Sequence, residues 1–79
     1  MLTMFVVERS FQKTTVRAYV EPQKRRCGLT IARNKRIVRM GDESDPTFRS
    51  FTAAQFGDPQ HWDREVGRIA ESWDNHPTS

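Results

Sequence analysis

Hydrophobic and polar residues alternate through the first forty positions in a pattern that predicts an antiparallel sheet. A period of two residues is typical of strands with one buried face. The period is cleanest over 14–21, where Val16, Ala18 and Val20 fall on the same face. Shorter apolar or alternating runs extend the prediction to three further strands, over about 2–9, 27–32 and 36–40.

The connections between these strands are short enough for a meander. Residues 10–13 suit a hairpin connection, and Pro22 ends the second strand because proline cannot donate to a ladder. Asn34 and Lys35 separate the third and fourth strands, and asparagine tolerates the left-handed conformation that tight hairpins need. The stretch 41–46 is predicted to be a loop from its glycine, proline and acidic residues.

Residues 46–56 leave two alternatives open. Asp45 and Pro46 could cap and start a helix. Alternatively, Thr47–Phe51 forms a fifth strand that is followed by a short turn. Serine, threonine and aromatic residues have modest helix propensity, so we slightly favour the strand.

The C-terminal segment carries the clearest helical signal. Asp58 is suited to the N-cap and Pro59 to the first helical position. The apolar residues that follow recur on one helical face: Trp62, Val66, Ile69, Ala70 and Trp73. We predict a helix over about 59–74 and a frayed tail over 75–79. Both tryptophans are expected to be buried against apolar strand residues, namely Val16, Val20, Leu29 and Ile31.

Together these elements predict one α+β domain over residues 1–79. Its architecture is an antiparallel β-meander of four or five strands, covered on one face by a C-terminal α-helix. The strands span about 2–40, or 2–51 if the fifth strand forms. A chain of 79 residues is long enough for one such domain and too short for two.

Charge is distributed unevenly along the chain, whose net charge is +3. Residues 1–40 carry ten basic residues against two acidic ones, whereas residues 41–79 carry three against eight. Such polarity bears on the choice of partner more than on the fold. No apolar run approaches the roughly 20 residues of a membrane span, and the N-terminus lacks the pattern of a signal peptide. We therefore expect an intracellular protein without membrane contact.

The meander separates the basic residues into two clusters. Alternate connections lie at opposite ends of a sheet, so these clusters are expected to be about 20 Å apart. The first set of candidate binding residues combines one end of the sheet with its open face: Lys13, Arg17, Tyr19, Arg33, Lys35, Arg36 and Arg39. The second candidate patch is Lys24, Arg25 and Arg26, which the acidic loop 42–45 is expected to neutralise in part. The end with Lys13 and 33–36 is therefore predicted to be the more positive.

Catalytic and metal-binding motifs are not apparent in the sequence. Cys27, His61 and His76 lack the paired spacing of a zinc site. The four glycines are scattered, so they form no phosphate-binding loop, and no nucleophile lies in a recognisable pattern with a base. We expect a protein that is not an enzyme, with no catalytic residues, no metal and no cofactor.

In size, meander-plus-helix layout and lack of an active site, the whole chain resembles the small anti-CRISPR proteins of phages and mobile elements that inhibit type I CRISPR effector complexes. The resemblance implies a location in the cytoplasm of a bacterial host, and the sequence leaves a monomer and a homodimer open. The resemblance also implies stoichiometric binding to a CRISPR surveillance complex, which blocks target-DNA binding or nuclease recruitment. Many such inhibitors are acidic and imitate DNA. This chain is basic overall, which favours docking of its basic end on an acidic protein surface or on the nucleic acid of the complex.

The alternative hypothesis is a small nucleic-acid-binding protein that uses the open face of the sheet. Cations suffice to contact phosphates, and an exposed tyrosine can stack on a base. The residues assigned to that face are Arg17, Tyr19, Arg33, Lys35, Arg36 and Arg39.

Overall fold

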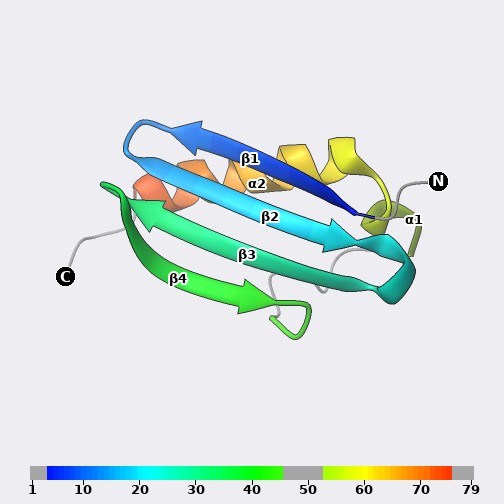
Figure 1. Ribbon diagram of the computed structural model, residues 1–79. Helices are drawn as coiled ribbons and strands as arrows, with labels where there is room; N and C mark the ends of the chain where they lie inside the picture. The colour runs from blue at the N-terminus through cyan, green and yellow to red at the C-terminus, as the bar shows by residue number, and fades with distance from the viewer. Residues whose placement is uncertain (1–3, 46–52, 76–79) are drawn as a thin grey trace.

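A computed structural model describes residues 4–45 and 53–75 of the protein and confirms the predicted α+β fold. Four antiparallel strands follow one another in the order β1-β2-β3-β4, and a C-terminal helix lies across one face of the sheet (Figure 1). The strands are β1 (Phe5–Phe11), β2 (Thr14–Glu21), β3 (Arg26–Arg33) and β4 (Arg36–Asp42). The helical segments are η1 (Pro22–Lys24, a 3-10 turn), α1 (Ala53–Phe56) and α2 (Pro59–Asp74).

The first hairpin is tighter than the sequence suggests. The predicted strand ended near residue 9, but Ser10 and Phe11 continue β1 and pair with β2. Only Gln12 and Lys13 remain in the turn, and Gln12 has a φ of 55°. A two-residue connection needs such a left-handed residue, and glutamine gives little sequence signal for it. The predicted four-residue loop was therefore wrong.

The second tight hairpin follows the prediction closely. Asn34 and Lys35 form the turn between β3 and β4, with φ angles of 52° and 67°. Two successive positive φ angles are the signature of a type I′ turn, in which asparagine is favoured. Both flanking strands extend one or two residues beyond their predicted ends.

A β-bulge interrupts the pairing of β4 with β3. Ile31 pairs with Arg39 and the next residue, Ala32, pairs with Ile37, so Val38 has no register partner. Bulges add twist and change which face a side chain occupies. The side chains of β4 therefore do not alternate regularly between the two faces of the sheet.

The segment after β4 is only partly described. The fifth strand predicted over 47–51 lies outside the described residues. Ala53–Phe56 forms a single helical turn, α1, and Phe56 is buried.

Helix α2 begins as predicted. The Asp58 carboxylate accepts a hydrogen bond from the backbone N–H of Gln60 at 3.0 Å, and Pro59 is the first helical residue. Its apolar stripe is buried at Trp62, Val66, Ile69 and Ala70. The indole N–H of Trp62 donates to the carbonyl oxygen of Phe56 at 2.9 Å, so this buried polar group is satisfied.

The core lies between α2 and one face of the sheet. Its strand residues are Val16, Ala18, Val20, Cys27, Leu29 and Ile31. The burial predicted for Trp62 is confirmed, since its exposed fraction is 0%. Trp73 is only partly buried and packs at the margin of the core. The reason is that α2 packs chiefly on β1 and β2, away from the β3–β4 half of the sheet.

Candidate functional site

The two tight hairpin turns meet at one end of the sheet and bring four basic residues together. The backbone N–H of Asn34 donates to the carbonyl oxygen of Lys13 at 3.0 Å. Lys13 therefore lies beside the β3–β4 turn, as the meander predicted. We call this end the basic pole and define it by Lys13, Arg33, Lys35 and Arg36. Both turns lie at the end of the molecule where α2 finishes (Figure 1).

The exposed cations of the basic pole form no ion pair in the described structure, although one carboxylate, that of Asp74, lies at the same end. Lys13, Lys35 and Arg36 are exposed, and none of them forms an ion pair with another described residue. The nearby carboxylate of Asp74 accepts instead from the hydroxyl of Thr14 at 3.0 Å and from the backbone N–H of Lys13 at 3.3 Å. These two bonds tie the end of α2 to the first turn, and the ammonium group of Lys13 remains available.

Arg33 does not lie in an exposed turn, as the sequence suggested. It is the last residue of β3, pairs with Thr14 and is only 8% exposed. It lies two residues after Ile31, so it points to the same helix-facing side of the sheet. Its Nε atom has no hydrogen-bond partner among the residues described. The prediction of an exposed Arg33 was wrong because β3 extends one residue further than expected.

The open face of the sheet carries Arg17 and Tyr19 but little net charge. Arg17 lies directly opposite Glu8 on β1. The ring of Tyr19 lies over Gly28 of β3, where a Cβ atom would overlap Tyr19 Cε1. Exposed Val6 is the neighbour of Tyr19 on β1, and Asp42 is the cross-strand partner of Gly28 on β4. This face is therefore mixed in charge and partly apolar.

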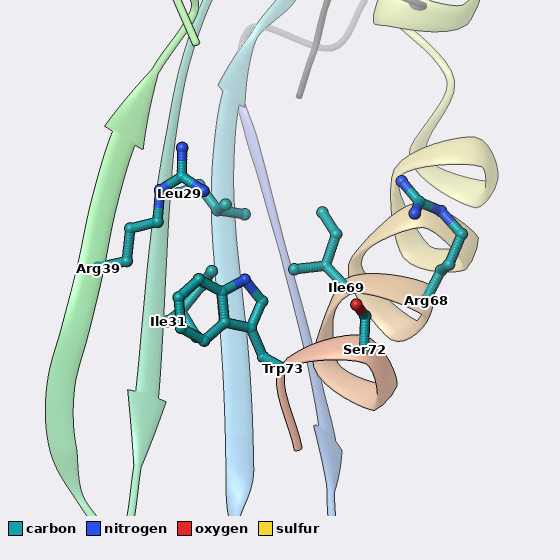
Figure 2. A pocket seen from close by; sticks show the side chains of 7 residues that line it. All are labelled: Leu29, Ile31, Arg39, Arg68, Ile69, Ser72 and Trp73. Carbon is teal, nitrogen blue, oxygen red and sulfur yellow. The ribbon is translucent and has the colours of Figure 1, made fainter. Parts of the chain in front are cut away.

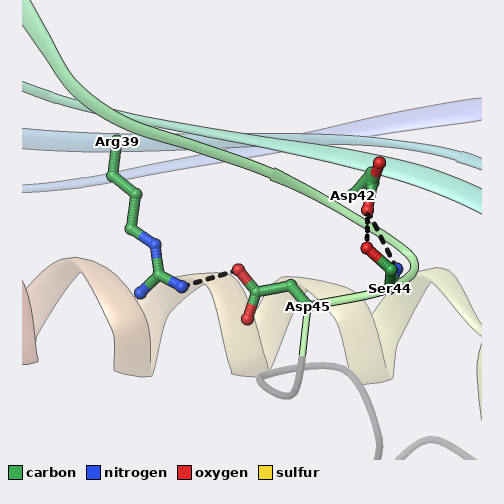
Figure 3. Close-up of polar contacts among 4 residues, drawn as sticks. All are labelled: Arg39, Asp42, Ser44 and Asp45. Carbon is green, nitrogen blue, oxygen red and sulfur yellow. Dashed lines mark hydrogen bonds and ion pairs between the residues drawn. The ribbon is translucent and has the colours of Figure 1, made fainter.

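Arg39 also lies on the helix-facing side, contrary to the prediction of a shared open face. It pairs with Ile31 in the β3–β4 ladder. Its Nη2 atom contacts Asp45 Oδ2 at 2.6 Å in an ion pair that holds the start of the following loop (Figure 3). Of the six residues assigned to the open face, only Arg17 and Tyr19 lie within it. Arg33 and Arg39 lie behind it, and Lys35 and Arg36 lie at its end.

The second candidate patch is engaged by groups other than the acidic loop. Lys24 Nζ lies 3.9 Å from Glu21 Oε2, and the guanidinium carbon of Arg25 lies 4.8 Å from the centre of the Phe56 ring. Arg26 is the cross-strand partner of Glu21. A cation over an aromatic ring is stabilised by the ring quadrupole. The cations of the second patch therefore have partners, Glu21 and Phe56, at their own end of the molecule.

The acidic loop lies at the same end as this patch, as predicted, but its carboxylates have specific contacts. Glu43 accepts from the backbone N–H of Cys27 at 3.0 Å. Asp42 accepts from the hydroxyl and the backbone N–H of Ser44 (Figure 3), and these bonds lower the pKa of its carboxyl group. Asp45 pairs with Arg39. The loop therefore binds its own strands.

A pocket lies between β4 and α2, and the sequence did not reveal it. Its volume is about 160 Å³, and its lining residues are Leu29, Ile31, Arg39, Arg68, Ile69, Ser72 and Trp73. Arg39 and Arg68 approach from opposite sides, with Trp73 and Ile69 between them (Figure 2). Arg68 donates two hydrogen bonds to Glu65, at 3.0 and 3.1 Å, which lower the pKa of that carboxyl group. The β-bulge that positions Arg39 has no sequence signature, so the pocket could not be predicted.

Chemically reactive groups are not clustered in the part of the chain that the structure describes. Over 4–45 and 53–75, no three histidine, cysteine or acidic side chains are placed to hold a metal ion. Burial raises the pKa of the Cys27 thiol to about 12, and the carboxylates of Glu43 and Asp42 add to the shift. None of the described helices is both long enough and apolar enough to span a bilayer.

Comparison of the chain with protein-family models, with curated proteins and with solved structures finds no significant match.

Proposed function

We propose that this chain is a non-enzymatic binding protein whose basic pole docks on an acidic surface of a partner protein complex. The observation that supports the proposal is the hydrogen bond between Asn34 and Lys13, which joins two turns and concentrates cations. Their exposed members, Lys13, Lys35 and Arg36, have no ion-pair partner among the described residues. Complementary charge steers association and fixes orientation.

A CRISPR surveillance complex of a bacterial host is the partner that we propose to test first. That partner comes from the resemblance of the chain to anti-CRISPR proteins. The basic pole would occupy an acidic protein surface of the complex and so block target-DNA binding or nuclease recruitment. The open face is mixed in charge, because Arg17 lies opposite Glu8 and Asp42 lies in the same cross-strand row as Tyr19 and Gly28. This mixture favours docking on a protein surface over binding of nucleic acid along the open face.

The experiment measures binding of labelled target DNA by purified type I effector complexes with increasing amounts of this protein. We expect inhibition that saturates at a fixed ratio of protein to complex. In parallel, a gel shift of the protein with the same DNA alone is carried out at low salt and at about 200 mM salt. A phosphate binder loses affinity steeply over that range. Strong, salt-sensitive shifts without any effector complex would contradict the proposal and support the nucleic-acid alternative.

A further inference from the structure

The pocket between β4 and α2 has apolar side chains in its floor and two arginines, Arg39 and Arg68, at its edges. Leu29 and Ile31 supply its sheet side, and Ile69 and Trp73 supply its helix side (Figure 2). The pocket exists because α2 packs chiefly on β1 and β2. Its volume of about 160 Å³ is small compared with the roughly 300–1,000 Å³ of typical small-molecule sites. This size suits one large side chain of a protein partner, which is how interface anchors are commonly bound.

The arginines of the pocket favour an acidic ligand. The side chains of Arg39 and Arg68 are 42% and 60% exposed, respectively. Each already contacts one carboxylate, Asp45 or Glu65. A guanidinium group has five N–H donors, so a single carboxylate leaves donors for a second acidic group. Acidic residues on either side of an apolar anchor side chain would therefore accept hydrogen bonds from Arg39 at one side of the pocket and from Arg68 at the other.

The pocket is continuous with the basic pole. Arg33 follows Ile31 on the helix-facing side of β3, and Arg36 is the cross-strand partner of Arg33. From the pocket toward the turn, the helix-facing side of β3 and β4 continues with the buried Arg33 and the exposed Arg36. A short extended segment that lies in the pocket can reach Lys35 in the turn within a few residues.

We infer that this pocket binds one bulky apolar side chain from an acidic segment of the partner, while the flanking acidic residues contact Arg39, Arg68 and the basic pole. The inference deepens the proposed function and rests on it, because the same segment contacts the pole. The occupant is a protein segment with an aromatic or large aliphatic anchor between acidic residues.

Two synthetic peptides test the inference. Both are acetylated and amidated heptapeptides with three acidic residues on each side of the central position, which is phenylalanine in one and alanine in the other. Titration at low salt with wild-type protein is expected to give at least about tenfold tighter binding of the phenylalanine peptide, because the ring is buried. Only this peptide is expected to change the tryptophan fluorescence strongly. The change reports Trp73, since Trp62 is fully buried.

Three variants separate the pocket from the pole. Ser72→Phe places an aromatic ring at the exposed rim of the pocket and is expected to abolish the preference for the phenylalanine peptide. The matched control is Gln60→Phe, at an exposed neutral position of α2 that does not line the pocket. It is expected to keep the preference. The double variant Lys35→Glu/Arg36→Glu is expected to weaken both peptides and to keep their affinity ratio.

The outcomes distinguish the two proposals. Equal affinity of wild-type protein for both peptides, or an unchanged preference in Ser72→Phe with native circular dichroism, overturns the pocket inference and leaves the pole standing. Unchanged binding of both peptides by Lys35→Glu/Arg36→Glu overturns the role of the pole and leaves the pocket standing. If neither peptide binds at low salt, the pocket inference fails, and the proposed function is decided separately by the titration of the effector complex.

Discussion

The two halves of the sheet differ in what covers their helix-facing side. On the β1–β2 half, α2 buries Val16, Ala18 and Val20 to an exposed fraction of 0%. On the β3–β4 half, Cys27, Leu29 and Ile31 of β3 are buried as well, but the same side of β4 leads outward to Arg39 and an open pocket. The core therefore rests on β2 and β3, with side chains of β1 packed against it, whereas the outer strand β4 contributes no buried core residue and leaves its helix-facing side accessible.

The difference follows from the side chains that each edge strand turns toward α2. On β1 these include Phe5, Val7 and Phe11, which pack against the core. Arg9, on the same side, forms an ion pair with Asp63 of α2 at 2.8 Å. On β4 the corresponding positions are basic or lack a side chain: Arg36, Arg39 and Gly41. The helix therefore packs over β1 and β2, because burial of apolar area is the main favourable term.

The largest difference between the halves is expected for the two tryptophans. Trp62→Ala removes a fully buried ring from the covered half and is expected to lower the free energy of unfolding by about 3–5 kcal/mol. Trp73→Ala removes a partly buried ring at the pocket and is expected to cost only about 1–2 kcal/mol. Chemical denaturation of both variants checks the order. A larger loss for Trp73→Ala would mean that the β3–β4 half is not open.

Gly28→Ala tests packing on the opposite, open face of the sheet. The new methyl group overlaps the Tyr19 ring, so we expect a loss of about 1–3 kcal/mol. Glycine is otherwise unfavourable within a strand. In a Tyr19→Thr background the same substitution is expected to be neutral or stabilising. A double-mutant cycle by thermal unfolding measures this coupling, and strict additivity would show that the ring does not lie over Gly28.

A pH dependence is expected from Cys27, which lies in the core beside the acidic loop. Its pKa is raised from about 9 to about 12 by burial and by neighbouring carboxylates. Above pH 9 the unfolded chain loses the thiol proton while the folded chain retains it, so stability falls as the pH rises toward 12. The decrease is up to about 1.4 kcal/mol per pH unit. Cys27→Ala is expected to show a shallower slope in urea unfolding at pH 8.5–10.5, and parallel slopes would contradict the assigned pKa.

The smallest effect on stability is expected at the basic pole. Lys35→Glu/Arg36→Glu changes two exposed charges without a described ion pair, so the free energy of unfolding is expected to change by less than about 0.5 kcal/mol. Binding to the partner is nevertheless expected to weaken, chiefly through slower association and a reduced salt dependence. The matched control is Lys24→Glu/Arg26→Glu, which spares the stacked Arg25. A greater loss of binding in this control would contradict the assignment of the pole.

Most of the fold could be predicted because its determinants are local. The alternation of β2, the Asn34–Lys35 turn and the N-cap at Asp58 each depend on neighbouring residues, and the structure has them where expected. The proximity of Lys13 to the β3–β4 turn could be predicted from the order of the strands alone. The placement of Arg33 and Arg39 could not be predicted. The burial of Arg33 depends on one extra residue in β3, and the face of Arg39 depends on a bulge in β4, which moves the residues beyond it to the other face of the strand.

The most direct test of the central claim is to map where an acidic partner segment contacts the protein. Amide ¹H–¹⁵N spectra of wild-type protein are recorded during titration with the phenylalanine heptapeptide at low salt. The account predicts that the largest shifts fall on the amides of Lys13, Asn34, Lys35 and Arg36 and on the indole N–H of Trp73. Largest shifts at Lys24, Arg25 and Arg26, or on Arg17 and Tyr19 of the open face, would contradict it.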